Sequence, residues 1–378
     1  MNLFDVYPLF DINPVKAKGS FLWDDKGQQY LDFYGGHAVM SIGHNHPYYQ
    51  DKLKDQLEKI SFYSNSVQND LQVELAQKLG ELSGYEDYSL FLCNSGAEAN
   101  ENALKLASFH NGKKNVIYFS GSFHGRTSAA VSVTDNPKIV VPVNFSDRFI
   151  KCDWNNVDAL ETIFKTKEIS AVIVEGIQGV GGINLPEEHF IQKIRSLCDS
   201  HDAVMILDEV QSGYGRAGHF FAHQEFDVKP DIITTAKGMG NGFPIAGVLI
   251  SPKFKAIHGL LGTTFGGNHL ACAAGIAVLD VIKNESLIDN AEKIGQYIEE
   301  KIKNFKHIKS IRRRGLMMGI ELDQACAGVR SDLLKKHFVF TGNANDKNVL
   351  RILPALNITE KEADIFIEAL EDTLQNLN

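Results

Sequence analysis

Short apolar runs alternate with helical patterns along most of the chain. Residues 116–119, 171–174, 204–207 and 247–250 form such runs, and none of them contains a charged residue. Runs of this length and composition are typical of strands that are buried on both faces of a sheet. Strands that alternate with helices favour a parallel sheet covered by helices on both sides. The pattern therefore predicts an α/β fold with a mostly parallel central sheet.

The helical patterns are clearest in the first hundred residues and after residue 270. Apolar residues at helical spacing predict one helix between residues 47 and 60 and another after Asn69. The apolar stripes are Leu53, Leu57 and Ile60 in the first helix and Leu71, Leu75 and Leu79 in the second. Further along, the pattern predicts a long helix over 271–282, a lysine-rich amphipathic helix, strands between 308 and 321, and a closing helix from Thr359.

Composition is that of an ordinary globular protein. Of the 378 residues, 44% are hydrophobic and 22% are charged, which suits one large domain and a smaller one. The formal net charge of −9 argues against nucleic-acid binding. The five cysteines, at positions 93, 152, 198, 272 and 326, contain no CxxC pair and favour a reducing compartment. Because no signal peptide and no membrane-spanning stretch is visible, we expect a cytoplasmic protein without a membrane partner.

Lys237 and Asp208 are the candidate chemical groups. Lys237 follows a predicted strand over 231–235 and precedes a glycine-rich segment that lets backbone approach a ligand closely. Asp208 directly follows the apolar run 204–207. Both residues therefore lie at the carboxyl ends of predicted strands, where open α/β sheets bind ligands. A lysine nucleophile that faces an aspartate suits pyridoxal phosphate chemistry.

Motifs around these two residues resemble those of a known enzyme family and follow its order. They are GHNHP (43–47), NSGAEANE (94–101), SFHGRT (122–127), DEVQ (208–211), TAKGMGNGFP (235–244) and TTFGGN (263–268). On these motifs the chain resembles the class III (subgroup II) pyridoxal-phosphate-dependent aminotransferases over nearly its whole length. Within that class it is most similar to the acetylornithine and succinylornithine aminotransferases.

The resemblance implies a fold type I transferase with a large and a small domain. The large domain would bind the cofactor and span residues 51–270. The smaller α+β domain would comprise residues 271–378 and recruit the amino-terminal segment, residues 1–50.

The resemblance also implies that the cofactor is pyridoxal 5′-phosphate, joined covalently to Lys237. Ser95, Gly96 and Ala97 begin a helical pattern, and a helix amino terminus is a natural phosphate seat. Taken alone, Ser95 would be an ordinary N-cap residue. In the family a threonine of the partner subunit also holds the phosphate, and Thr264 matches it, which implies a homodimer.

Further residues match those that surround the cofactor ring in the family. Phe123 matches the aromatic residue that lies against the pyridine ring, and His124 follows it in the same loop. Asp208 matches the partner of the protonated ring nitrogen, which helps the ring to accept electrons. Gln211 matches a glutamine beside the 3-oxygen of the ring, and Glu175 matches a glutamate in the supporting polar network.

Substrate residues are carried over with two departures from the family pattern, at Val180 and at His37. Arg126 matches the arginine that grips the α-carboxylate of the donor, and a guanidinium can hold a carboxylate with two hydrogen bonds. Relatives usually have a glutamate where this chain has Val180, and that glutamate masks the arginine matched by Arg351. His37 occupies a position at the far end of the substrate pocket. An unmasked arginine and a histidine would favour an acyl group that carries its own carboxylate, such as succinyl.

The predicted reaction moves the terminal amino group of an N-acylornithine to 2-oxoglutarate. It would yield N-acylglutamate 5-semialdehyde and glutamate, with Lys237 as both tether and general base. Other aminotransferases of this scaffold, which act on ornithine or 4-aminobutyrate, remain open, as do an aminomutase, a decarboxylase and a non-enzymatic interaction protein.

A glycine motif and a pair of histidines allow other interpretations. GYGRAG (213–218) satisfies G-x-G-x-x-G, the fingerprint of dinucleotide binding, but it does not directly follow the strand and no βαβ unit follows it. His44 and His46 are candidate metal ligands, but histidines in such a turn are more often structural. We therefore expect neither a nicotinamide cofactor nor a metal.

Overall fold

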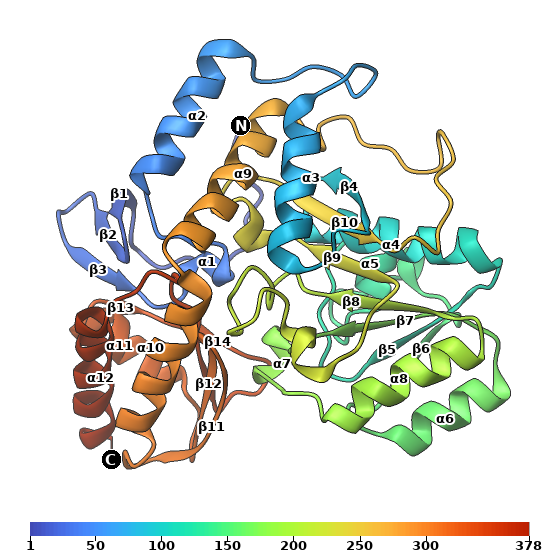
Figure 1. Cartoon of the computed structure of the whole chain (residues 1–378). Helices are drawn as coiled ribbons and strands as arrows, with labels where there is room; N and C mark the ends of the chain where they lie inside the picture. Colours follow the sequence, from blue (N-terminus) through green and yellow to red (C-terminus); the bar gives the residue numbers. More distant parts are fainter. Residues whose placement is uncertain (378) are drawn as a thin grey trace.

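A seven-stranded sheet forms the centre of the large domain (Figure 1). The protein is described by a computed structural model that covers residues 1–377. Only β10 runs against its neighbours among the described strands of this sheet, so the prediction of a mostly parallel sheet is confirmed. In spatial order the strands are β4 (Ser89–Cys93), β10 (Ala246–Ile250), β9 (Ile232–Thr235), β8 (Val204–Asp208), β7 (Ile169–Glu175), β5 (Asn115–Phe119) and β6 (Phe149–Cys152).

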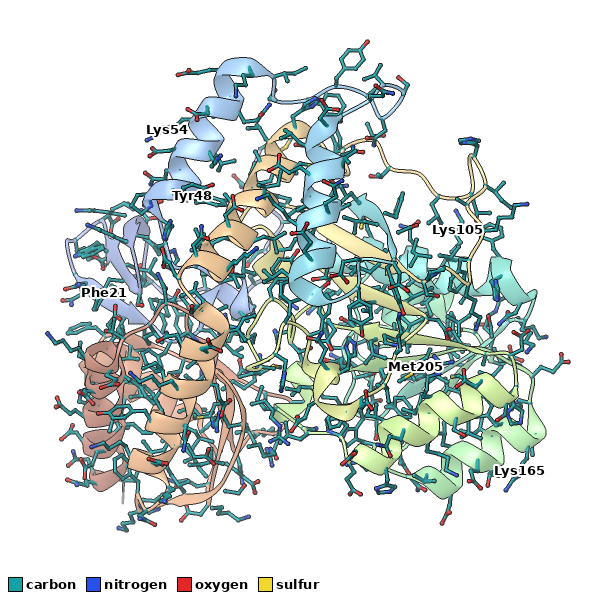
Figure 2. All side chains as sticks on the ribbon, viewed as in Figure 1. Phe21, Tyr48, Lys54, Lys105, Lys165 and Met205 are labelled. Atoms are coloured by element: carbon teal, nitrogen blue, oxygen red, sulfur yellow. The ribbon has the colours of Figure 1, made fainter. Side chains whose placement is uncertain are left out.

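Helices cover both faces of this sheet, and the strand side chains alternate between them. On β7, Val172 and Val174 pack in a core with α6 and α8, whereas Ala171 and Ile173 pack in a second core with α4. Met205 is fully buried in the layer beneath α8 (Figure 2). Burial on both faces explains why these strands are continuously apolar. The covering helices are α4 (Gly96–Asn111), α6 (Val157–Thr166) and α8 (Glu188–Ser200).

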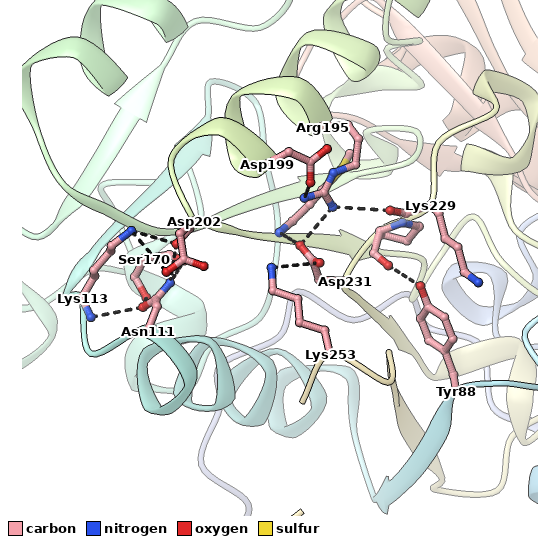
Figure 3. Close-up of polar contacts among 12 residues, drawn as sticks. Tyr88, Asn111, Lys113, Ser170, Arg195, Asp199, Asp202, Lys229, Asp231 and Lys253 are labelled. Atoms are coloured by element: carbon pink, nitrogen blue, oxygen red, sulfur yellow. Dashed lines mark hydrogen bonds and ion pairs between the residues drawn. The ribbon is translucent and has the colours of Figure 1, made fainter. Parts of the chain in front are cut away.

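Polar contacts join the segments at the amino ends of the central strands (Figure 3). Asp231, which precedes β9, forms an ion pair with Arg195 at 3.0 Å. Asn111, at the end of α4, donates hydrogen bonds of 2.9 and 3.1 Å to the backbone oxygens of Ser170 and Asp202. Side chains thus tie this edge of the sheet together, while a cavity occupies the carboxyl edge.

The small domain is built on a second, antiparallel sheet. Thr359 caps its closing helix with a reciprocal capping box to Glu362, so the predicted helix start is confirmed. The predicted strands between residues 308 and 321 are also present, as β11 and β12. In spatial order the strands are β11 (Ile308–Arg314), β12 (Met317–Leu322), β15 (Val349–Ile352) and β14 (Gly342–Asn343), and the helices are α10 (Leu287–Ile302), α11 (Ala327–Lys336) and α12 (Glu360–Gln375).

The amino-terminal segment forms a third sheet with a strand from the other end of the chain. Val339 and Phe340 of that strand pair in parallel with Leu31 and Asp32. Pairing of this kind joins the amino-terminal segment to the small domain, on the left of Figure 1. The strands are β1 (Pro14–Lys18), β2 (Phe21–Asp24), β3 (Gln29–Asp32) and β13 (Val339–Phe340), and the short helix α1 (Gly35–Ala38) follows β3.

Three helices pack together at the upper side of the molecule as drawn in Figure 1, namely α2 (Pro47–Lys59), α3 (Asp70–Ser83) and α9 (His269–Asn284). The Asn69 side chain caps α3, and Leu75 and Leu79 are buried, as expected from the sequence. The stripe of α2 behaves differently, because Leu57 is 60% exposed and Ile60 is 41% exposed. Periodicity located the helix correctly, but nothing within the described chain covers much of its apolar stripe.

The remaining elements are short. They are the helices α5 (Ser128–Ser132) and α7 (Gly179–Gly182) and the 3-10 turns η1 (Pro142–Asn144), η2 (Ala222–Phe226) and η3 (Lys237–Met239). Over residues 1–377, no helix has the length and apolar character required to cross a membrane. The same residues contain no cluster of three or more side chains suited to holding a metal ion.

Candidate active site

A cavity of about 440 Å³ opens at the carboxyl edge of the central sheet. Glu175 ends β7, Asp208 ends β8, and Lys237 follows β9, so neighbouring strands deliver all three to its wall. The sequence-predicted site residues that line the cavity are Ser95, Gly96, Ala97, Phe123, His124, Arg126, Glu175, Asp208, Gln211 and Lys237.

Lys237 begins the turn η3 and is partly buried. Its φ of 41° is unusual for a residue with a side chain and marks local strain of the kind found at functional sites. Burial lowers the pKa of its amine, and the charge of Arg351 acts in the same direction, whereas Asp208 and Glu175 oppose the shift. A lowered pKa makes the uncharged, nucleophilic amine more accessible.

Asp208 is 4% exposed and is held by donors on both carboxylate oxygens. Its Oδ2 accepts hydrogen bonds from His124 Nδ1 at 2.7 Å and from Asn100 Nδ2 at 2.8 Å. Its Oδ1 accepts one from the backbone N–H of Val210 at 3.0 Å. A buried carboxylate that is oriented by three donors suits a partner for a protonated ring nitrogen.

Glu175 is a second buried carboxylate in the wall. Its two oxygens accept hydrogen bonds from the backbone N–H groups of Phe123, at 3.0 Å, and Gly179, at 3.1 Å. Burial raises the pKa of Glu175 to about 7, partly offset by His124 and reinforced by Asp208. Glu175 therefore links the loop that carries Phe123 to the turn that begins α7.

The amino terminus of α4 points its first backbone N–H groups toward the cavity wall at Gly96 and Ala97. Ser95 is the N-cap residue, and its hydroxyl accepts a hydrogen bond from the N–H of Glu98. A Cβ at Gly96 would lie 2.7 Å from Cγ1 of Val210, so only glycine fits there. Ser95, Gly96 and Ala97 at this helix start form an anion seat. With the buried carboxylate of Asp208 and the half-buried amine of Lys237, the cavity holds the groups that pyridoxal phosphate requires.

His37 and Arg351 lie beside this cavity rather than in its wall, and Gln211 connects them to it. Gln211 Nε2 donates to the backbone oxygen of His37 at 3.2 Å, and Arg351 Nη1 donates to Gln211 Oε1 at 3.4 Å. Arg351 also donates to the Tyr34 hydroxyl at 3.3 Å, which lies 2.5 Å from His37 Nδ1. Among the ion pairs of residues 1–377, none includes Arg351. Val180 lines the cavity nearby.

Thr264 is exposed in the long loop before α9 and does not line the cavity of its own chain. Its neighbour Thr263 lies near the anion seat, because Asn94 Nδ2 donates to Thr263 Oγ1 at 3.3 Å. Contribution of Thr264 to the site of a partner subunit therefore stays a prediction.

Sequence reasoning missed two residues that shape the site. Asn100 contacts Asp208 directly, and Tyr34 connects His37 with Arg351. Asn100 belongs to the NSGAEANE motif, which is the one signal that pointed near it. Nothing in the local sequence distinguishes Tyr34 from an ordinary tyrosine.

The alternative motifs have structural roles. Residues 213–218 form turns and a bend, with Gly215 at φ 84° and Gly218 at φ 82°, and the element that follows them is the short 3-10 turn η2, not an α-helix. His44 bonds to Asp32 at 2.9 Å and His46 bonds to Glu285 at 2.9 Å. Both histidines therefore have hydrogen-bond partners within the protein.

Comparisons with known proteins agree with this site. Residues 5–374 match the family Aminotransferase class-III. The acetylornithine aminotransferase of Nitrosomonas europaea is 38% identical over 376 residues, which cover 96% of this chain and 95% of that protein. The acetylornithine aminotransferase of Bacillus subtilis is 38% identical over 379 residues, which cover 99% and 97% of the two chains.

Solved structures show the same architecture. The acetylornithine aminotransferase of Elizabethkingia anophelis superposes with a TM-score of 0.85 at 31% identity, covering 99% of this chain and 96% of that one. An ornithine aminotransferase of Toxoplasma gondii, described with partial occupancy of PLP at its active site, superposes with a TM-score of 0.90 at 30% identity, covering 98% and 92%. The chain belongs to the class-III aminotransferases, has the fold type I architecture and uses pyridoxal phosphate, and its relatives mark it as an ornithine-type ω-aminotransferase.

Proposed function

We propose that this aminotransferase moves the terminal amino group of an N-acylornithine to 2-oxoglutarate, as a step of arginine biosynthesis. The products are N-acylglutamate 5-semialdehyde and glutamate. The observation that carries the proposal is the position of Arg126, which is exposed on the wall of the cavity that Lys237 and Asp208 also line. A donor whose carboxylate binds Arg126 can extend its distant amine toward Lys237.

Asp208, the amino terminus of α4 and Phe123 would hold the cofactor. Asp208 would pair with the ring nitrogen, Ser95 and the N–H groups of Gly96 and Ala97 would bind the phosphate, and Phe123 would lie against the ring. When bound, pyridoxal phosphate supplies an electron sink for the carbon next to the transferred amine.

Lys237 would have two tasks. Its amine would tether the cofactor in the resting enzyme, and the free amine would hold or move a proton at the substrate carbon. The lowered pKa of Lys237 favours both tasks, because only the neutral amine can form a bond or accept a proton. Glu175 and Gln211 would keep the surrounding loops and the polar face of the ring in place.

Substrate carboxylates would bind two arginines, Arg126 in the wall of the cavity and Arg351 beside it. Arg126 would clamp the α-carboxylate of the donor with paired hydrogen bonds. Arg351 contacts only neutral groups, namely Tyr34, Gln211 and the backbone oxygen of Asn343, so it can accept a second carboxylate. With His37 nearby, this second position favours a succinyl donor over an acetyl donor, and it also suits 2-oxoglutarate.

We further propose that the enzyme is a homodimer in which Thr264 binds the phosphate in the partner's site. Large apolar side chains are exposed near that loop, and contiguous exposed apolar surface marks protein interfaces. Phe62 and Phe265 are in contact, with ring centroids 5.5 Å apart, and are 40% and 60% exposed. The exposed apolar residues of this region are Leu57, Ile60, Phe62, Tyr63, Val67, Val73 and Phe265.

Cytoplasmic location is part of the proposal and is supported by the cysteines. All five are free and buried, as is usual in a reducing compartment.

A donor screen tests the proposal. Purified enzyme is given ornithine, N-acetylornithine, N-succinylornithine, 4-aminobutyrate or lysine, and glutamate formed from 2-oxoglutarate is measured, with Lys237→Ala as the blank. Highest kcat/KM for an N-acylornithine supports the proposal, and preference for succinylornithine supports the second carboxylate position. Preference for ornithine or 4-aminobutyrate would contradict the proposal and indicate another ω-aminotransferase. Product formed without glutamate would indicate an aminomutase or a decarboxylase.

A further inference from the structure

Asn100 occupies a buried position in α4 directly beneath the active-site carboxylate. It is 1% exposed, and its side-chain nitrogen donates one hydrogen bond to Asp208 Oδ2 and one to the backbone oxygen of His124, both at 2.8 Å. Its side-chain oxygen accepts a hydrogen bond from the hydroxyl of Thr234 at 2.7 Å. A flipped amide would point its oxygen at two acceptors, so the surroundings fix its orientation.

The contact from Asn100 determines which oxygen of Asp208 is left free to bind a ligand. Each carboxylate oxygen has two lone pairs. On Oδ2 both are used, by Asn100 and His124, whereas Oδ1 receives only the N–H of Val210. Oδ1 is therefore the oxygen with acceptor capacity left for a ligand, and the Asn100–His124 pair selects it.

Asn100 also ties the two ends of the cofactor site to one rigid element. Ser95, Gly96 and Ala97 form the anion seat at the start of α4, and Asn100 lies in the next turn of the same helix. Thr234 anchors Asn100 from β9, which is the strand that leads to Lys237. One amide side chain thus connects the helix of the phosphate seat, the strand of Asp208 and the strand before Lys237.

We propose that Asn100, anchored by Thr234, is a positioning residue that fixes the orientation of the Asp208 carboxylate and presents its Oδ1 to the ring nitrogen of the cofactor. The inference rests on the proposed role of Asp208. Loss of the Asn100 donor makes the Asp208 anion less stable, which weakens its hold on a protonated ring. An asparagine that only filled space in the core would influence stability and leave the protonation behaviour of the bound cofactor unchanged.

The test compares holoenzyme of wild type, Asn100→Ala and Thr234→Val. Asn102→Ala is the matched control, because Asn102 lies on the same helix and bonds only to the backbone oxygen of Glu98. The pH titration of the cofactor absorbance band is recorded for each, together with kcat, KM and the thermal unfolding midpoint. In Asn100→Ala we expect the titration midpoint to move upward by about one pH unit and kcat to fall about ten-fold, with KM for the donor nearly unchanged. Thr234→Val should shift the titration midpoint in the same direction by less. Asn102→Ala should change neither the titration midpoint nor kcat.

Two further comparisons keep the outcome decisive. If Asn100→Ala fails to retain the cofactor, Thr234→Val decides, since it removes one hydroxyl and keeps the shape of the side chain. Asp208→Asn is titrated in parallel. The inference about Asn100 is overturned, and the proposed role of Asp208 stands, if the titration midpoint is unchanged in the Asn100 and Thr234 variants but shifted in Asp208→Asn. If Asp208→Asn is unshifted as well, the proposed role of Asp208 is also wrong.

Discussion

Glu175 is the register partner of Asp208 in the parallel pairing of β7 and β8, which places two buried carboxylates side by side at the edge of the sheet. Donors hold Asp208 on both oxygens, including the side chains of His124 and Asn100. Glu175 receives only backbone donors, and burial raises its pKa to about 7. Two adjacent carboxylates therefore have different hydrogen-bond surroundings.

Glu175 should make the stability of the apoprotein depend on pH. Its folded-state pKa of about 7 lies above the ordinary value of 4.5, so the folded state binds this proton more tightly than the unfolded chain. The stabilisation is complete below pH 4.5 and is lost as the pH rises through 7. We expect Glu175→Gln to gain up to about 3 kcal/mol relative to wild type between pH 5 and pH 8. Urea unfolding at several pH values measures this, and Glu168→Gln, at an exposed position just before the other end of β7, is the control and should show no such trend.

Lys237 combines the amine proposed for catalysis with a strained backbone, and substitutions should separate these properties. Lys237→Ala and Lys237→Gly both remove the amine, so kcat should fall roughly 10³-fold or more in each. At φ 41° glycine is unstrained, so the Gly apoprotein should be about 1 kcal/mol more stable than the Ala apoprotein. Enzyme assays measure kcat, and thermal unfolding measures the stability of the apoproteins. Equal stability of the variants would show that the turn relaxes without strain.

Glu209, the residue after Asp208, should stabilise the fold. Its carboxylate accepts hydrogen bonds from Ser212, from the backbone of Ala222, and from the backbone and ring of His223, whose other nitrogen bonds to Tyr85 at 2.6 Å. Glu209→Ala would leave these buried donors unpaired and should cost about 3 kcal/mol. Tyr85→Phe removes a single hydrogen bond and should cost about 1 kcal/mol. Urea unfolding of the apoproteins compares the two, and equal costs would contradict this ranking.

Arg216, within the glycine motif, should control substrate binding from a distance. It is 2% exposed, and its guanidinium donates to the backbone oxygens of Pro354 and Met40, which follow the segments carrying Arg351 and His37. Arg216→Met leaves those oxygens without a donor, so the two segments should loosen. We expect KM for the donor to rise roughly ten-fold with a smaller change in kcat. Arg216→Lys keeps the charge without the forked geometry, so its KM should lie between the values of wild type and Arg216→Met. An unchanged KM in Arg216→Met would show that other contacts fix these segments.

Local sequence patterns predicted the elements whose environment is uniform along their length. The runs 171–174 of β7 and 204–207 of β8 are apolar because both faces of these strands are buried. The side chains of Asn69, Ser95 and Thr359 cap helices through contacts within a few residues. The exposed stripe of α2 was not predictable in this way. Periodicity shows that Leu57 and Ile60 share a face but not what covers that face.

Contacts between distant segments account for what the sequence did not reveal. The two-residue strand β13 pairs with β3 from the other end of the chain, and strands that short carry no periodic signal. Asn100 resembles any polar helix residue until folding brings α4 against β8. Motif resemblance identified Lys237, Asp208 and Arg126 as candidates, but only the fold shows that they share one cavity.

Val180 should determine how the enzyme treats an acyl group. It lines the cavity, and the resemblance to the family implies a glutamate at this position in relatives. Arg351 forms no ion pair with any of residues 1–377, and its strand β15 packs against α7, which carries Val180. In Val180→Glu the new carboxylate should pair with Arg351 and compete with a substrate carboxylate for it. We expect kcat/KM for N-succinylornithine to fall roughly ten-fold or more, with a smaller effect on N-acetylornithine. Val180→Gln, which has similar size and no charge, is the control, and it should affect both donors alike. An equal loss of kcat/KM for both donors in Val180→Glu would show that Arg351 does not bind the carboxylate of the acyl group.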